Sequence, residues 1–213
     1  PLNKILIVDN ASTDGTIESL KSNGWLQNSR IQILRLEENM GGAGGFSIGW
    51  QNAIESGAEW LWVMDDDGFP AKDCLEKLIG IALQKNIQAI SPLQVDIHDS
   101  TKPAFPSLDA DGNWIVKLPH HPKSDNPFTP SHANLFNGLL IAKSVVIKIG
   151  LPRAELFIRG DEVEYKNRML TNKVEFGTYS HALFYHPSDR NERHSILGGL
   201  GSARDANSDF KNY

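Results

Sequence analysis

A short apolar run that ends in three consecutive carboxylates lies in the first third of the chain. Residues 60–67 read Trp-Leu-Trp-Val-Met-Asp-Asp-Asp, and Pro70 follows closely. The run is shorter than an ordinary helix, and it is typical of a buried strand. Carboxylates at the carboxyl end of a parallel strand lie where open α/β sheets bind ligands. The run therefore predicts a strand of such a sheet, with a polar site at its end.

The sequence around this run alternates strands with helices. We expect strands over 5–8, 31–36, 60–64 and 89–91, separated by helices over 16–22, 43–56 and 71–85. Repeated alternation of this kind is the mark of parallel strands covered by helices. The first ninety residues therefore predict an α/β fold, with a Rossmann-like, mostly parallel sheet flanked by helices.

The second half of the chain is less regular at its start. Residues 92–130 are rich in Pro, Asp, Ser and His, and we expect an excursion over one face with a strand at 114–117. Regular structure resumes over 133–142, with helices at 144–149 and 161–172 and a strand at 182–185. Residues 188–208, rich in Gly, Ser and Asn, predict a loop.

Composition excludes several classes of protein. The 213 residues carry 21 Lys and Arg against 26 Asp and Glu, a net charge of -5, so no basic surplus indicates a nucleic-acid partner. The apolar runs are too short to form a transmembrane segment. The single cysteine, Cys74, cannot form an internal disulfide, which suits a reducing compartment. We therefore expect a cytoplasmic protein.

The three carboxylates have two interpretations. Along an extended backbone, Asp65 and Asp67 point to the same side and Asp66 to the other, so the outer pair could share one divalent cation. Alternatively, these residues cap the helix that follows Pro70. An EF-hand is excluded, because Phe69 and Pro70 stand where that loop needs an oxygen ligand and a glycine.

Two further strand-to-helix turns carry polar or glycine-rich sequence. Residues 9–16 read Asp-Asn-Ala-Ser-Thr-Asp-Gly-Thr, where Asp9 could accept hydrogen bonds from a nucleobase or ribose, and Ser12 or Asp14 could cap the helix. Residues 39–45 read Asn-Met-Gly-Gly-Ala-Gly-Gly, which allows a ligand or a neighbouring element to approach closely. Neither a P-loop nor a dinucleotide fingerprint is present, which disfavours a kinase-type ATPase and a Rossmann dehydrogenase.

In their order and spacing, these motifs resemble the family 2 inverting glycosyltransferases of the GT-A fold. The resemblance continues through Phe-Asn-Gly at 136–138, Phe-Ile-Arg-Gly-Asp-Glu-Val-Glu-Tyr at 157–165 and Phe-Tyr-His-Pro at 184–187. The Asp-Asp-Asp variant is similar to the galactofuranosyltransferase and rhamnosyltransferase branch. The resemblance covers most of the chain and is weakest over 92–130.

The resemblance implies a role for each motif. The metal would be Mn²⁺ or Mg²⁺, and its implied ligands are Asp65, Asp67 and His186. Glu162 would be the general base, with Asp161 the second choice. The implied donor-binding residues are Asp9, Asn39, Gly41, Gly42, Asp65, Asp66 and Asp67. Without the resemblance, a histidine after a strand is more often structural, and an acidic pair at a helix start is more often a complement to the helix dipole.

The sequence also departs from the family pattern. The match starts at what is normally the second strand, and it ends at residue 213, where relatives continue with a further helix. Ile48 occupies a position where relatives often carry Arg. We therefore expect one catalytic domain over 1–213 that lacks the usual first strand and belongs to a longer protein. Its nucleotide-sugar half is 1–91, and its acceptor and base half is 92–213.

Three functions compete at this point. The resemblance implies a metal-dependent inverting transferase of bacterial cell-envelope polysaccharide synthesis, with galactofuranose or rhamnose as the sugar. Its partners would be a UDP- or dTDP-linked donor and a glycan or lipid-linked glycan acceptor, met in the cytoplasm or at the inner face of the membrane. A non-catalytic module that binds a glycan or a protein is the alternative. A sugar-phosphate nucleotidyltransferase would carry a basic, glycine-rich loop after its first strand, and none is visible.

Overall fold

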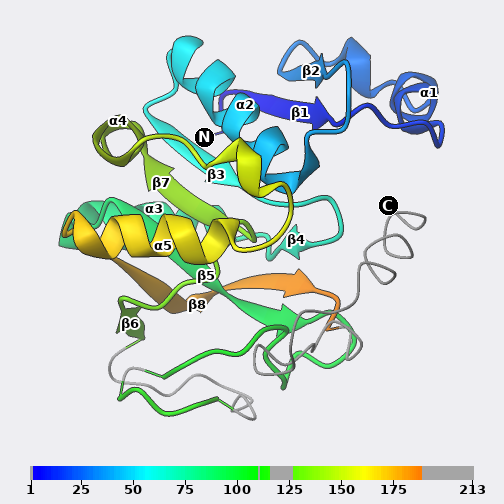
Figure 1. Ribbon diagram of the computed structural model, residues 1–213. Helices are drawn as coiled ribbons and strands as arrows, with labels where there is room; N and C mark the ends of the chain where they lie inside the picture. The colour runs from blue at the N-terminus through cyan, green and yellow to red at the C-terminus, as the bar shows by residue number, and fades with distance from the viewer. Residues whose placement is uncertain (1, 110, 116–126, 189–213) are drawn as a thin grey trace, which may run out of the picture.

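The computed structural model describes residues 2–109, 111–115 and 127–188 (Figure 1). The strands are β1 Ile5–Asp9, β2 Ile31–Arg35, β3 Trp60–Val63, β4 Phe69–Pro70, β5 Ala89–Asp96, β6 Phe128–Pro130, β7 Leu139–Ala142 and β8 Phe176–His186. The helices are α1 Thr16–Ser22, α2 Gly41–Glu55, α3 Cys74–Lys85, α4 Lys143–Ile149 and α5 Asp161–Thr171, with 3₁₀ turns η1 Trp25–Gln27 and η2 Ala154–Leu156. None of the described helices has the length and apolar character needed to cross a membrane.

The strands form two sheets. The larger has six strands in the order β3-β7-β5-β8-β4, with β6 also paired to β8, and the smaller is the parallel pair β1-β2. β7 runs antiparallel to both β3 and β5, and β5 runs parallel to β8. Strands β3, β5 and β8 therefore point in one direction. Their carboxyl ends meet at the same edge of the sheet, where α/β proteins place their ligands.

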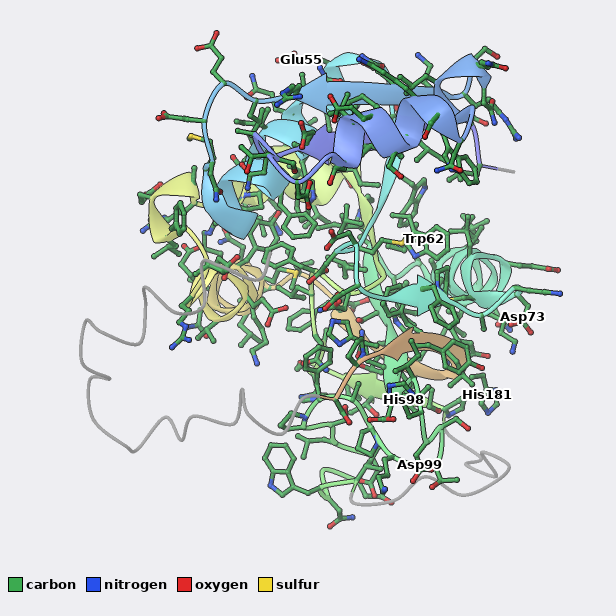
Figure 2. The ribbon with its side chains drawn as sticks, turned by 90° about the vertical axis from the view of Figure 1, so that its right-hand side faces the viewer. Glu55, Trp62, Asp73, His98, Asp99 and His181 are labelled. Carbon is green, nitrogen blue, oxygen red and sulfur yellow. The ribbon has the colours of Figure 1, made fainter. Side chains whose placement is uncertain are left out.

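Helices cover both faces of the larger sheet. Successive residues of a strand point to opposite faces, so Ile141 of β7 packs in one core cluster with Tyr165 of α5, while Leu140 packs in a second with Leu78 of α3. Trp50 of α2 joins the first cluster, with its ring edge-on to Tyr165 at 5.3 Å between centroids. Figure 2 shows the yellow helix α5 and the teal helix α3 on opposite sides of the strands. The α/β class predicted from the sequence is confirmed.

The main differences from the predicted elements lie at the ends of strands. β5 continues to Asp96, into the region expected to leave the sheet, because the pairing with β8 shifts register between Pro92 and Leu93. This irregularity accommodates a proline, which cannot donate to the ladder. β8 begins at Phe176 rather than 182, and β4 and β6 were not predicted. Of the strand predicted at 114–117, Trp114 forms a single bridge with Leu108, and 116–117 lie outside the described residues, as does nearly all of the predicted loop 188–208.

The glycine-rich turn at the start of α2 joins the two halves of the chain. Gly41 has φ +68°, and a Cβ placed there would lie 2.4 Å from the carbonyl oxygen of Phe157. The N–H of Ala43 donates to that same carbonyl at 2.8 Å. Asn10 holds the turn from the other side, because its Oδ1 accepts the N–H of Met40 at 2.8 Å and its Nδ2 donates to the Gly41 carbonyl at 2.9 Å. The turn is thereby fixed against the segment that leads into α5.

Because of this contact, we expect substitution of Gly41 to destabilise the protein more than substitution of the adjacent Gly42. Gly41→Ala should lower the free energy of unfolding by about 1–3 kcal/mol or more, because the backbone is left-handed there and the methyl group would meet the Phe157 carbonyl. Gly42→Ala is the matched control, since a methyl group added there would have nothing within 4 Å, and it should change stability by less than about 1 kcal/mol. Urea unfolding followed by circular dichroism measures both. Equal losses would show that the Phe157 contact does not constrain position 41.

Candidate active site

Three side chains from the two halves of the chain converge at the sheet edge. Asp65 and Asp67 follow β3, His186 ends β8, and one ligand atom from each lies within 4.8 Å of the others. The Nε2 atom of His186 is 2.9 Å from Oδ1 of Asp67. The three residues therefore meet the geometric condition for ligands of one cation. Asp66 lies between the two carboxylates and is exposed.

The imidazole of His186 is buried and held at both nitrogens. Its Nδ1 lies 2.7 Å from the carbonyl oxygen of Pro187, and because a carbonyl can only accept, Nδ1 carries the proton. Nε2 is then the nitrogen that faces Asp67. Burial opposes the charged ring, but the hydrogen bonds to Asp67 and Pro187 outweigh it and raise the pKa of His186. A ring with Nδ1–H bonded to a carbonyl is the arrangement common among histidines that bind metals.

The carboxylates carry more negative charge than the single histidine balances. Asp65 is partly exposed to solvent. Partial desolvation by the surrounding protein, and to a lesser extent the negative charge of Asp67, nevertheless raise the pKa of Asp65 to about 7. The hydrogen bond from His186 lowers the pKa of Asp67. A divalent cation would relieve this repulsion, and two carboxylates with one imidazole suit Mn²⁺ as well as Mg²⁺.

The start of α5 brings a second pair of acids to the same edge. Oε1 of Glu162 accepts a long hydrogen bond from the N–H of Phe136 at 3.4 Å. Burial raises the pKa of Glu162 and also that of Asp161. The negative charge of Glu162 contributes to the raised pKa of Asp65, and the charge of His186 lowers the pKa of Glu162. Glu162 is therefore close enough to interact electrostatically with both residues. Of the predicted pair, Glu162 is the acid that interacts with the three-residue group.

Asp9 lies at the carboxyl end of β1, with its side chain fully buried. Its Oδ1 accepts the N–H of Ser12 at 3.1 Å, and its Oδ2 lies 3.4 Å from Nε of Arg35 on β2. Within the described part of the chain, Oδ2 accepts no hydrogen bond. A buried carboxylate oxygen of this kind is suited to accept a hydrogen bond from a ligand.

The other predicted donor-binding residues gather at the nearby start of α2. Asn39 is exposed, and its Oδ1 accepts the N–H of Gly41 at 2.9 Å. Gly41 is buried against Phe157, whereas Gly42 faces open space. Among the residues described, no hydrogen bond or ion pair joins Asp9, Asn39 or the glycines to the Asp65, Asp67 and His186 group.

Several residues of the site were not singled out from the sequence. Arg35 stands opposite Asp9 in the β1-β2 register, a relation that strand pairing could have indicated. Asn10 was part of a quoted motif, but its two hydrogen bonds to the backbone of Met40 and Gly41 were not predicted. The ring of Phe105 lies 4.7 Å from that of His186, and it comes from the irregular segment where periodicity gives no signal.

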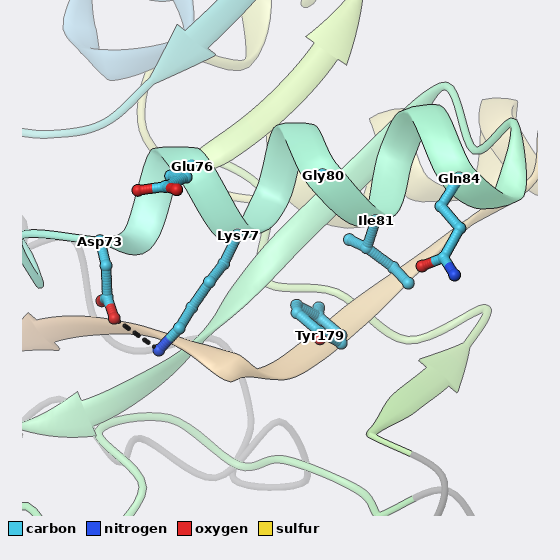
Figure 3. Close-up of a pocket in the computed structure, with 7 residues that line it drawn as sticks. All are labelled: Asp73, Glu76, Lys77, Gly80, Ile81, Gln84 and Tyr179. Carbon is cyan, nitrogen blue, oxygen red and sulfur yellow. Dashed lines mark ion pairs between the residues drawn. The ribbon is translucent and has the colours of Figure 1, made fainter.

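A cavity of about 580 Å³ lies elsewhere, between α3 and Tyr179 of β8 (Figure 3). An ion pair of 2.8 Å between Asp73 and Lys77 lies on its wall. The ring of His181 is 5.4 Å from that of Tyr179, and His181 and Asp73 appear on the same side of the molecule in Figure 2. No residue of the Asp65, Asp67 and His186 group lines this cavity.

The family assignment comes from comparison with known proteins. The sequence profile described as Glycosyl transferase family 2 matches residues 1–150. The chain belongs to this family. It is 35% identical over 199 residues to galactofuranosyltransferase GlfT1 of Mycobacterium tuberculosis, an alignment that covers 92% of this chain and 64% of the relative. GlfT1 of Mycolicibacterium smegmatis is 37% identical over 167 residues, covering 76% of this chain and 55% of the relative. The chain thus spans less than two thirds of either relative.

Solved structures agree on the fold. A crystal structure of GalNAc-T7 with UDP, GalNAc and Mn²⁺ aligns with a TM-score of 0.65 and 17% identity, over 94% of this chain and 40% of the other. Staphylococcus aureus TarS in complex with UDP aligns with a TM-score of 0.59 and 14% identity, over 86% of this chain and 51% of the other. These likenesses confirm the GT-A architecture that the family 2 glycosyltransferase motifs predicted.

The raised pKa values of Asp65 and His186 would make the affinity of a metal for this group depend on pH near neutrality. Below the pKa values of Asp65, about 7, and of His186, both groups hold protons that a metal must displace, so affinity should rise as pH rises through this range. We expect Mn²⁺ binding, followed by electron paramagnetic resonance, to weaken about tenfold or more from pH 8 to pH 6. His181→Ala, outside the group, should keep the same profile. A flat profile would contradict this use of His186 and Asp65.

Proposed function

We propose that this domain is a metal-dependent inverting glycosyltransferase that moves a sugar from a nucleotide diphosphate donor to a glycan hydroxyl. The observation that supports it most is the convergence of Asp65, Asp67 and His186 beside Glu162 at the carboxyl edge of the sheet. Family membership and the GT-A architecture support the same activity. A non-catalytic module would have no need of this charge arrangement.

On the donor side, Asp65, Asp67 and His186 would hold Mn²⁺ or Mg²⁺, with Asp66 near the sugar. When bound, the cation would supply electrostatic stabilisation for the negative charge that grows on the leaving diphosphate. Asp9, through its buried Oδ2, would accept a hydrogen bond from the base or ribose. Asn39, Gly41 and Gly42 would line the remainder of the donor site.

On the acceptor side, Glu162 would take the proton of the attacking hydroxyl. The hydroxyl oxygen bonds to C1 of the sugar as the bond from C1 to the diphosphate breaks, which inverts the configuration at C1. Burial raises the pKa of Glu162, which strengthens it as a base once ionised. Asp161 is buried beside it and would serve to orient the helix start rather than to accept the proton.

The names of the relatives suggest the sugar and the setting. Since the GlfT1 proteins are galactofuranosyltransferases, we favour galactofuranose, with rhamnose as the second choice. We favour UDP rather than dTDP as the nucleotide, because the GalNAc-T7 and TarS structures contain UDP. The acceptor would be a glycan or a lipid-linked glycan of the bacterial cell envelope. The enzyme would work in the cytoplasm or at the inner face of the membrane.

The base is tested by two isosteric substitutions. Glu162→Gln should lower the rate of transfer about a hundredfold or more, because the amide cannot accept the proton, while UDP affinity persists. Asp161→Asn, the adjacent control, should keep most of the activity. Transfer from a panel of nucleotide sugars in the presence of Mn²⁺ provides the measurement. A Glu162→Gln enzyme at nearly full rate beside an inactive Asp161→Asn enzyme would reverse the assignment.

A further inference from the structure

His186 is supported by a part of the chain that carries no family motif. β5 ends at Asp96, which stands opposite His186 in the parallel register, and the N–H of Ile97 donates to the His186 carbonyl at 3.0 Å. The backbone of the histidine is thereby fixed at the end of its strand. A backbone hydrogen bond does not prevent rotation of the side chain, so the orientation of the imidazole ring must be fixed by other contacts.

The orientation of the ring depends on the Pro187 carbonyl, which accepts the Nδ1 proton at 2.7 Å. That carbonyl belongs to the peptide unit between Pro187 and Ser188. The hydroxyl of Ser188 donates to Oδ2 of Asp96. Asp96 is therefore connected to the metal-facing histidine through the residue that sets the position of its hydrogen-bond acceptor.

The other oxygen of Asp96 organises the loop that packs on the ring. Oδ1 accepts the N–H groups of His98 and Asp99, each at 2.7 Å, and Asp96 itself is only 8% exposed. The loop then returns along β5, with the N–H of Ala104 donating to the Gln94 carbonyl at 3.0 Å. The next residue, Phe105, lies against the His186 ring.

We propose that Asp96 is a positioning residue for His186. Through Ser188 on one side and the 97–105 loop on the other, it holds the imidazole in the Nδ1–H tautomer, with Nε2 turned toward Asp67 and the metal. The role rests on the proposed metal site and deepens it. An ordinary loop cap would need only the two backbone N–H groups; the tie to Ser188 extends beyond that requirement.

The test compares Mn²⁺ affinity, with MnCl₂ alone as the probe, across matched variants. Asp96→Ala should weaken binding about tenfold or more, since partners that orient metal ligands typically contribute about 10- to 100-fold. Ser188→Ala should change it in the same direction while removing less of the loop. Asp96→Asn keeps an acceptor for His98 and Asp99 and a partner for Ser188, and should restore most of the affinity.

Asp99→Ala is the control on the same loop, where His98 and Asp99 are marked in Figure 2. Asp99 accepts hydrogen bonds from Thr101 and forms an ion pair with Lys102 at 2.7 Å, without touching His186, so its loss should leave Mn²⁺ affinity within about twofold of wild type. A loss as large as that of Asp96→Ala would show that any disturbance of the loop suffices, and would overturn the assignment.

A second readout follows the tautomer itself. In ¹⁵N NMR with saturating MgCl₂, whose cation would occupy Nε2, wild type should show a ring protonated at Nδ1 alone, and Asp96→Ala and Ser188→Ala should gain the Nε2–H form, in which Nε2 binds no metal. If Asp96→Ala does not fold, Ser188→Ala decides. Unchanged tautomer and Mn²⁺ affinity in folded variants, beside a large loss in His186→Ala, would overturn the positioning role alone. No loss in His186→Ala would overturn the metal site and this role with it.

Discussion

The contact between His186 and Asp67 is the constraint on which the site depends. It joins the end of β8 to the segment after β3, two strands separated in the sheet by β7 and β5. The contact is possible because β3, β5 and β8 point the same way, so their ends meet at one edge. Any change that tilted β8 relative to β3 would separate His186 from Asp65 and Asp67.

The carboxylates at this edge of the sheet repel one another, and this repulsion indicates that the site is suited to a positive charge. Asp67 and Glu162 both lie close enough to Asp65 to raise its pKa, and a single imidazole cannot neutralise three carboxylates. Like charges in a partly desolvated site are normally relieved by protonation, by an opposite charge or by a bound cation. The proposed divalent ion would provide this relief, and α5, packed through Tyr165 and Met169, keeps Glu162 beside the group.

Much of this could be predicted from the sequence, because local signals and motifs report it directly. The strand before Asp65, the apolar period of α3 and the glycines at the start of α2 each have a local signature, and the family resemblance pointed to His186 and Glu162. Other features depend on contacts distant in sequence. The continuation of β5 past Pro92, the requirement for Gly41 against Phe157 and the support of His186 by Asp96 and Phe105 arise only when the chain has folded.

The central claim is that the three-residue group binds a metal together with a nucleotide diphosphate, and calorimetry of UDP with and without Mn²⁺ tests it most directly. Two carboxylates and one imidazole leave coordination positions that diphosphate oxygens and water can fill. UDP should therefore bind more tightly when Mn²⁺ is saturating, and Mn²⁺ should bind more tightly to the UDP complex by the same factor, because coupling is reciprocal. UDP that bound with the same affinity in the presence and absence of Mn²⁺ would contradict the account.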